Sequence, residues 1–420
     1  MIIAGVNSAR GGGVALICGD RLTLGATGDV DDARVLRQLL ANSGHTPVDV
    51  DEWAQPGTPA SQGVGLASAT AVAYPRSECR LAAAWCTSPF AASGERATVV
   101  VWDTDAAALA YAVDADGRYA RIDAEPFDTV PELGDRLRTA GDGGPMNLCL
   151  TGDRALDVTL SSAIRTLPEV KALWVPPFPD VTGDAAGAAA LHLAHCRTRA
   201  ATDAGDPADP VLPGLAWRLR SGTVPARPVH VPAGWTVSPC RPEELARMLV
   251  RGGRPVVFIN GPAKLGPYAL GSRSILAPAT SGDARARLGA LRGDPTGTTV
   301  TALCLERDVP DVFAPGIPDP YVRFEHRLRD EWADRLPGLA DGGPGPLRVQ
   351  TVSMDDDPTL STVVREYHKW SGIPALCATD AVPADTGPLA DVAAALSWGG
   401  LDLVWSDNIL YRANRQEPPR

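Results

Sequence analysis

The sequence has no Cys-x-x-Cys pair, although 8 cysteines are spread over its 420 residues. This scatter excludes zinc-finger and thioredoxin-like motifs, and we expect reduced, partly buried thiols. No apolar run approaches the roughly 20 residues of a membrane span, and neither a G-x-S-x-G motif nor a Walker A lysine is present. The apolar start Met1–Val6 lacks a basic segment, so we interpret it as a strand. We expect a cytoplasmic protein without membrane partners.

Positive charge is also scarce, with 39 Lys and Arg against 50 Asp and Glu and a net charge of −11. A general nucleic-acid binder needs a dominant basic face, so we expect no nucleic-acid partner. The negative net charge still allows a local cationic pocket for an anionic ligand. The length and the hydrophobic content of 45% allow two domains, each with its own core.

Along most of the chain, short apolar stretches typical of strands alternate with glycine turns and with segments whose apolar residues have helical spacing. This pattern predicts an α/β fold. Residues 201–228 lose this periodicity and are interpreted as a linker between domains at 1–200 and 229–420. The expected strands are Met1–Val6, Val14–Cys18, Ala97–Trp102, Ala106–Val113, Asn147–Leu150, Leu173–Val175, Val256–Ile259, Arg348–Val352, Ala375–Ala378 and Leu401–Trp405. The expected helices cover Asp31–Asn42, Leu156–Thr166, Gly183–Cys196, Arg241–Val250, Thr359–Trp370 and Leu389–Trp398.

The segment Gly266–Ala277, GPYALGSRSILA, is the richest in chemistry. Glycines allow backbone N–H groups to approach a ligand, and Arg273 beside Ser274 can hold a planar, oxygen-rich group by forked hydrogen bonds. We expect a cationic cradle here. In the first domain, Gly-Asp turns at Gly152 and Gly183 open expected helices, where backbone donors and a carboxylate suit a phosphate or a metal.

This segment resembles the GPRALGNRSILADP-like signature of the nodulation, cephamycin and tobramycin type O-carbamoyltransferases. Five further segments resemble the family in the same order: 5–7, 147–157, 183–187, 348–352 and 372–376. The resemblance implies an N-terminal actin-like ATPase domain of the ribonuclease-H-like class, shortened here, at 1–200. It implies a C-terminal YrdC-like α/β domain at 229–420.

The resemblance also implies a reaction. Carbamoyl phosphate and ATP, with Mg, would form carbamoyl adenylate, and the carbamoyl group would pass to a hydroxyl of a small specialised-metabolite precursor. A homodimer is left open. The residues carried over for the adenylate chemistry are Lys264, Arg273, Ser274, Arg348 and Gln350. Those carried over for the nucleotide are Gly152, Asp153, Asp157, Gly183 and Asp184, and those for a metal are Asp103 and Asp184.

Several positions depart from the family. Arg76 and Arg80 stand where the HHxAHA histidines would supply imidazole to iron, and a guanidinium has no lone pair for a metal. We therefore do not expect the iron site. A solvated charged edge is the favoured interpretation of this pair, and two guanidiniums that hold phosphate are the alternative. Tyr268 replaces the first signature arginine, and we expect it to pack against Leu270 and Phe258.

Two other functions stay open because of these losses. One is a catalytically degenerate homologue that acts as a nucleotide-binding or regulatory partner. The other is an altered adenylate-forming reaction on the same scaffold. His192 and His195 lie three residues apart on an expected helix, where a helix surface or a satisfied core position is favoured over a metal site. Asp157 is a candidate helix cap, and Asp184 a cap or a ligand.

Overall fold

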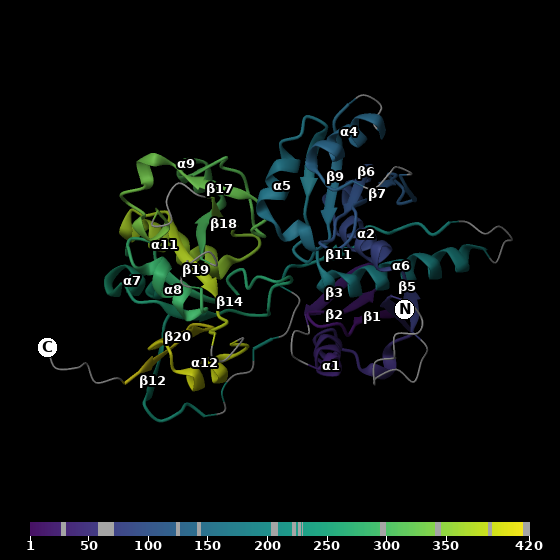
Figure 1. The fold of residues 1–420 in the computed structure, drawn as a ribbon. Coiled ribbons are helices and arrows are strands. Elements are labelled where there is room, and N and C mark those ends of the chain that lie inside the picture. Colours follow the sequence, from purple (N-terminus) through teal and green to yellow (C-terminus); the bar gives the residue numbers. More distant parts are fainter. Residues whose placement is uncertain are drawn as a thin grey trace. The chain divides into compact units, whose positions relative to one another are not determined.

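The computed structural model describes residues 1–26, 31–57, 71–122, 127–140, 144–202, 209–220, 224–225, 228, 230–294, 300–340, 346–384 and 389–414. The chain forms two compact units (Figure 1). Unit 1 comprises Met1–Thr223 with Leu265–Pro267, and unit 2 comprises Val224–Lys264 with Tyr268–Arg420. Both units are mixed α/β, as expected from the alternating pattern. In the described part of the chain, no helix is long and apolar enough to cross a membrane.

The first sheet of unit 1 starts with the expected hairpin, in which β1 pairs antiparallel with β2. Its described strands lie in the order β11-β3-β2-β1-β4-β5. Strand β11 belongs to the stretch expected to be a linker, so this part of it is folded into unit 1. The bounds are β1 Ile2–Asn7, β2 Gly13–Cys18, β3 Arg21–Ala26, β4 Glu52–Pro56, β5 Val72–Tyr74 and β11 Ala216–Trp217.

The second sheet of unit 1 has the described order β10-β9-β6-β7-β8. Strand β6 runs parallel to β9 and antiparallel to β7, so the carboxyl ends of β6 and β9 meet at one edge. The bounds are β6 Ala97–Val101, β7 Leu109–Val113, β8 Tyr119–Arg121, β9 Met146–Thr151 and β10 Val170–Trp174.

The helices of unit 1 cover both sheets. Helix α6 packs on β1, β2 and β4, while α2 packs on α6 and on β6 and β9. Helix α1 covers the other face of the first sheet, where Val6, Val14 and Leu36 share one apolar cluster. The bounds are α1 Asp32–Asn42, α2 Arg76–Cys86, α3 Pro89–Ser93, α4 Val130–Ala140, α5 Val158–Arg165 and α6 Val181–Thr202, with 3₁₀ turns at Pro47–Asp49 and Asp153–Leu156.

Unit 2 is built on one sheet with the described order β12-β21-β20-β13-β14-β19-β15-β18-β17-β16. Its central strands are buried along nearly their whole length, as their continuous apolar runs predict. The second half of the signature segment is part of this sheet as β14, not a loop. The bounds are β12 Trp235–Pro239, β13 Val256–Ile259, β14 Arg273–Pro278, β15 Thr301–Leu305, β16 Phe313–Ala314, β17 Glu325–Leu328, β18 Leu347–Val352, β19 Ala375–Asp380, β20 Leu403–Ser406 and β21 Ile409–Ala413.

Helices of unit 2 close its core. Helices α7 and α11 pack on each other, and α8 packs on β14 and β19. Glycines 253, 372 and 399 end α7, α11 and α12 in the left-handed conformation, which favours glycine. The bounds are α7 Pro242–Gly252, α8 Ala284–Leu291, α9 Val309–Val312, α10 Pro337–Ala340, α11 Pro358–Ser371 and α12 Val392–Trp398, with 3₁₀ turns at Glu306–Asp308 and Asp330–Trp332.

Candidate active-site residues

Three carboxylates of unit 1 gather at the carboxyl ends of parallel strands. Asp103 follows β6 and Asp153 follows β9, and the backbone N–H of Asp153 donates to Oδ1 of Asp103 over 3.1 Å. Asp184 lies in the first turn of α6 and has no exposed surface. Ligands of α/β proteins bind at this edge of a sheet. The structure thus brings together three residues that the sequence analysis selected separately.

Arg80 of α2 occupies the centre of this group. Its Nε donates to Oδ1 of Asp184 over 3.1 Å, its Nη2 lies 3.2 Å from Oδ1 of Asp153, and its Nη1 pairs with Asp103. The Arg80 side chain is only 2% exposed. The interpretation of Arg80 as part of a solvated charged edge is therefore wrong: three carboxylates compensate its desolvation.

Asp184 has further partners. Nε of Arg76 lies 3.2 Å from its Oδ2, and Nδ2 of Asn7 donates to the same oxygen over 3.4 Å. Arg76 is 51% exposed, so here the interpretation as an exposed edge holds, although one end of the side chain is paired. Burial raises the pKa of Asp184 to about 6, against the opposing effect of Arg80 and then Arg76. The carboxyl is ionised at neutral pH and takes up a proton in mild acid.

The donor set does not fit a metal ion at this point. Oxygens of Asp103 and Asp184, the two expected metal ligands, already face a guanidinium that lies between them. Its nitrogens cannot donate a lone pair, and its charge repels a second cation. At Arg80, where the resemblance implies a histidine ligand of iron, the structure has a buried fixed cation.

The other nucleotide residues expected in unit 1 have local structural contacts. Gly152 has φ of 103°, and a Cβ there would lie 2.1 Å from the carbonyl oxygen of Trp102. A Cβ on Gly183 would lie 2.2 Å from the carbonyl oxygen of Phe178. Asp157 caps α5 by accepting from the N–H of Thr159 over 2.9 Å. These contacts explain the residue types by packing and capping.

Helix α6 begins earlier than the Gly-Asp turn predicts. Its first residue is Val181, and the N–H of Thr182 donates to Oδ1 of Asp180 over 3.2 Å. Asp180 therefore accepts a hydrogen bond at the helix start, and Asp184 is free of the capping role. The Asp184 side chain points instead to the two arginines of α2.

In unit 2, three of the five expected adenylate residues share one pocket. Ser274 of β14 lines it together with Arg348 and Gln350 of β18. These two residues are two positions apart, so both side chains lie on the same face of the strand, as their spacing predicts. Arg292 and Asp380 add charges of opposite sign, and Nη1 of Arg292 lies 3.6 Å from Oδ2 of Asp380. The remaining lining residues are Tyr268, Leu270, Thr301, Val322, Ala378 and Thr379.

The backbone around this pocket is strained. Leu270 and Val322 have φ of 45° and 58°, in the left-handed region that residues other than glycine rarely adopt, β-branched valine least of all. Nε2 of Gln350 donates to the carbonyl oxygen of Leu270 over 2.9 Å, and the buried carboxylate of Asp319 accepts from the N–H of Arg323 over 2.7 Å. Strain held in place by such contacts is concentrated at functional sites.

Tyr268 contacts two arginines that the sequence analysis did not connect with it. Its ring lies 5.4 Å from the guanidinium carbon of Arg323 and 5.6 Å from that of Arg348. Nη1 of Arg348 also lies 3.4 Å from the Tyr268 hydroxyl. The aromatic ring thus positions two cations beside the pocket by cation–π contact, and burial raises the pKa of the neighbouring Asp380.

The other two expected adenylate residues hold the signature segment together. Nζ of Lys264 lies 2.9 Å from Oδ2 of Asp357 and donates to the carbonyl of Leu270, and both charged side chains are buried. Arg273 donates from Nε to the carbonyl of Ala390 over 2.7 Å and from Nη1 to that of Gly261 over 2.9 Å. Neither residue lines the pocket. The cations that do are Arg348, which the sequence analysis selected, and Arg292, which it did not.

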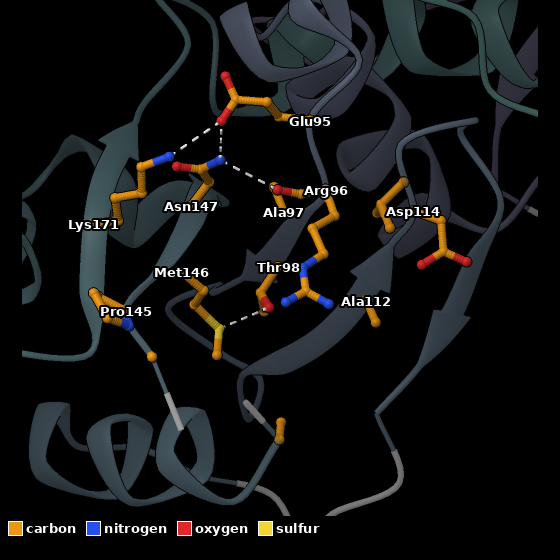
Figure 2. Close-up of a pocket in the computed structure, with 13 residues that line it drawn as sticks. Glu95, Arg96, Ala97, Thr98, Ala112, Asp114, Pro145, Met146, Asn147 and Lys171 are labelled. Atoms are coloured by element: carbon orange, nitrogen blue, oxygen red, sulfur yellow. Dashed lines mark hydrogen bonds and ion pairs between the residues drawn. The ribbon is translucent and has the colours of Figure 1, made fainter. Parts of the chain in front are cut away.

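A larger pocket, of about 490 Å³, lies at the opposite end of the second sheet of unit 1. Its lining includes Ala97 and Thr98 at the amino end of β6 and Met146 and Asn147 at the amino end of β9 (Figure 2). Oε2 of Glu95 accepts from Nδ2 of Asn147 over 3.0 Å and from Nζ of Lys171 over 3.3 Å. The charges here neutralise one another, and the described lining includes no residue of the carboxylate group.

Residues 246–399 match the family model of the carbamoyltransferase C-terminus. The chain is 40% identical over 272 residues to Nodulation protein U of Rhizobium tropici, which is 65% of this chain and 44% of that protein. It is 28% identical over 254 residues to the 3'-hydroxymethylcephem-O-carbamoyltransferase of Streptomyces clavuligerus, which is 60% of this chain and 45% of that protein. The chain thus spans about half the length of the curated relatives it matches.

Among solved structures, YeaZ from Pseudomonas aeruginosa aligns with 47% of this chain and 93% of its own, at 16% identity and a TM-score of 0.27. This likeness is too weak to define the fold. The family match places a carbamoyltransferase C-terminal domain within unit 2 of this mixed α/β protein. The chain thus carries a domain of the carbamoyltransferase C-terminal family and is similar to Nodulation protein U and the cephem O-carbamoyltransferase, which confirms the resemblance found in the signature segment.

Proposed function

We propose that the protein is an ATP-dependent O-carbamoyltransferase. It would transfer a carbamoyl group from carbamoyl phosphate, by way of carbamoyl adenylate, to a hydroxyl of a small specialised-metabolite precursor. The pocket of Ser274, Arg348 and Gln350 supports this proposal most strongly, because it lies within the segment that matches the carbamoyltransferase C-terminus. Actin-like and YrdC-like folds for units 1 and 2 remain part of the proposal.

The proposed reaction has three steps. Carbamoyl phosphate and water give carbamate and phosphate. A carbamate oxygen attacks the α-phosphorus of ATP, the bond to the β-phosphate oxygen breaks, and carbamoyl adenylate and pyrophosphate form. The acceptor hydroxyl then attacks the carbonyl carbon, AMP leaves with the bonding electron pair, and the hydroxyl proton passes to a base. Mg²⁺ accompanies ATP and offsets the charge of its phosphates.

In unit 2, Arg348 and Arg292 would attract the anionic groups of carbamoyl phosphate and ATP. Forked guanidinium hydrogen bonds suit phosphate and carbamate oxygens, and Ser274 and Gln350 add neutral polar groups. Asp380 lies among these cations. Its carboxylate also accepts from the N–H of Ala269 over 2.7 Å, which holds the signature segment beside the pocket.

In unit 1, we propose that the group of Arg80 and its three carboxylates binds no iron. Arg80 supplies a fixed positive charge that keeps Asp103, Asp153 and Asp184 together. The exposed end of Arg76 is left to meet a ligand phosphate. Elemental analysis of the purified protein tests this part of the proposal, because stoichiometric iron that disappears in Asp184→Asn would contradict it.

Pyrophosphate exchange tests the first half of the reaction. We expect labelled pyrophosphate to enter ATP only when carbamoyl phosphate is present. Arg348→Gln should lower the exchange rate at least about tenfold, the loss of one charge-assisted contact. Arg287→Gln is the matched control, since Arg287 of α8 is 51% exposed and outside the pocket. Equal rates in both variants would exclude this pocket as the site.

A degenerate homologue is the second candidate, and the contacts of Lys264 and Arg273 favour it. Both cations are committed to holding the signature segment, so fewer remain for substrate. Folded protein that binds ATP without any exchange would support this candidate. Exchange that requires a carboxylic acid in place of carbamoyl phosphate would instead support an altered adenylate-forming reaction.

A further inference from the structure

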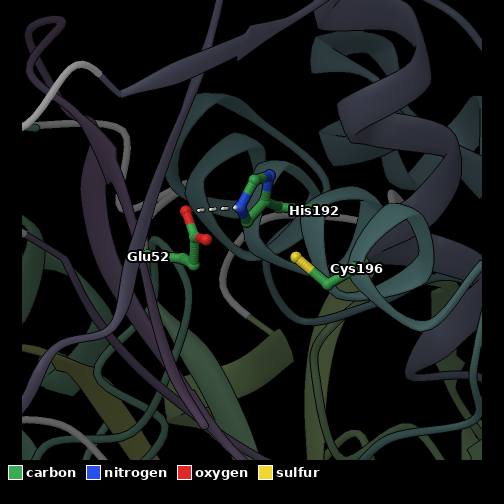
Figure 3. Close-up of side chains that lie close together, drawn as sticks. All are labelled: Glu52, His192 and Cys196. Atoms are coloured by element: carbon green, nitrogen blue, oxygen red, sulfur yellow. Dashed lines mark hydrogen bonds and ion pairs between the residues drawn. The ribbon is translucent and has the colours of Figure 1, made fainter. Parts of the chain in front are cut away.

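A second group of chemically active side chains lies in unit 1, on the far half of α6. His192 and Cys196 are one helical turn apart and face the same side, and Glu52 opens the neighbouring strand β4 (Figure 3). Their ligand atoms all lie within 4.8 Å of one another, and Nε2 of His192 is 3.3 Å from Oε2 of Glu52. None of these residues belongs to the carboxylate group around Arg80.

We propose that Glu52, His192 and Cys196 form a zinc site. The spacing of His192 and Glu52 suits two ligands of one tetrahedral ion, whose bonds are about 2.0–2.3 Å long for this ligand set. A thiolate, a carboxylate and a neutral imidazole together balance the charge of Zn²⁺. A mixed sulfur, nitrogen and oxygen set selects a borderline ion such as Zn²⁺ over the hard Mg²⁺.

The residues around His192 fix the orientation of its ring. Its ring is 2% exposed. Nδ1 lies 2.9 Å from the Tyr74 hydroxyl. With Nδ1–H donating to this oxygen, the lone pair of Nε2 faces Glu52, the arrangement typical of zinc-bound histidine.

The open side of the group allows an ion to enter. Glu52 is 44% exposed and Cys196 is partly exposed. Nη2 of Arg199 donates to Sγ of Cys196 over 3.1 Å, and a zinc ion would replace this exposed cation. A fourth position would be left to water. The ion would tie α6 to β4, the strand next to β5 at the edge of the first sheet.

Cobalt substitution tests the proposal on the full chain. We expect the chelator-treated protein to bind one Co²⁺ with a thiolate charge-transfer band and tetrahedral d–d bands, and Zn²⁺ to abolish both. Cys196→Ser should lose the charge-transfer band. Cys18→Ser, at another partly exposed cysteine of unit 1, is the control and should keep it.

Two further variants separate ligation from structure. Glu52→Gln should weaken Co²⁺ binding, and Tyr74→Phe should weaken it about 10- to 100-fold while Phe retains the packing of the ring. Zn²⁺ should raise the melting temperature of wild type and of Cys18→Ser, and not that of Cys196→Ser. A wild type without the charge-transfer band, or a band that survives Cys196→Ser, would overturn the zinc site. These readouts do not depend on carbamoyl transfer, so either proposal can fail alone.

Discussion

Arg80 has a role in stability that can be measured directly. Arg80→Met keeps most of the volume but leaves Asp103, Asp153 and Asp184 facing one another without their cation. Removal of one partner from a buried ionic group costs about 3–5 kcal/mol, and we expect a loss at the lower end because Asp153 is 43% exposed. Urea denaturation at pH 7, followed on unit 1, measures this loss.

Arg76→Met is the control for that experiment. Arg76 pairs with the same Asp184 but is 51% exposed, so its removal should cost less than about 1 kcal/mol. If both variants lose the same stability, burial is not what makes Arg80 important, and its role as the central cation is refuted.

Asp184 predicts a pH dependence with a defined sign. Its pKa in the folded protein is about 6, above the ordinary value of 3.8, so the folded state holds the proton more tightly than the unfolded chain. The stabilisation from protonated Asp184 is complete below about pH 4 and is lost as the pH rises through 6. The difference in unfolding free energy between wild type and Asp184→Asn should therefore fall by about 2 kcal/mol from pH 4 to pH 7.

Urea titrations of both proteins at several pH values provide the test. Arg80→Lys in the same series keeps the central positive charge and should retain the downward trend. A difference that rises with pH would mean that pairing with the arginines, not burial, dominates the Asp184 pKa.

Individual residues were predictable from the sequence where their role is local. Asp157 as a helix cap follows from its position before an apolar helix, and Arg348 and Gln350 share a pocket because a strand alternates its side chains. The burial of Arg80 was not predictable, since its compensating carboxylates come from three elements up to 104 positions away. The cation–π position of Tyr268 depends in the same way on the distant Arg323 and Arg348.

At the scale of elements, the crossing of α2 and α6 depends on one glycine. A Cβ on Gly187 would lie 1.7 Å from the carbonyl oxygen of Cys79, too close for any heavy-atom contact. Gly187→Ala should push the two helices apart and cost about 3 kcal/mol, the upper end for overpacking. It should also displace Arg80 and Asp184, which face each other across the same pair of helices.

Gly134→Ala is the matched control on a helix. Gly134 lies inside α4, and its nearest neighbours would be 3.6 Å from an added Cβ, an ordinary contact. The substitution should stabilise the protein by about 0.5–1 kcal/mol through helix propensity. Thermal unfolding of both variants measures the contrast, and a tolerated Gly187→Ala would refute the close packing.

The spacing of apolar residues predicted most helices and strands correctly. The strands that it failed to predict lie where this spacing is weak. The strand Arg21–Ala26 mixes exposed and buried positions, and the sequence analysis did not predict it. The last strand, Ile409–Ala413, follows a two-residue turn at Asp407 and Asn408, which both have positive φ. The signature segment was expected as a loop because of its glycines, yet Arg273–Pro278 pairs on both sides within the sheet.

At the scale of the whole molecule, the chain contains separate cores. The largest apolar cluster runs from Cys240 to Tyr411 within unit 2, and the remaining clusters lie within unit 1. The sequence predicted two domains from length and from the loss of periodicity at 201–228. It could not predict that part of this stretch is strand β11, because Ala216–Trp217 carries no apolar pattern of its own.

Separate cores predict that unfolding is not a single transition. In urea, we expect the two units to lose hydrogen-exchange protection at different denaturant concentrations. Arg80→Met should shift only the transition of unit 1 peptides. Val364→Ala, which opens a cavity at a fully buried position of α11, should shift only that of unit 2 peptides. Mass spectrometry of exchanged peptides assigns each transition to its unit. One common transition, shifted equally by both variants, would show that the two units unfold together. A stability change measured in one unit could then not be attributed to the contacts of that unit alone.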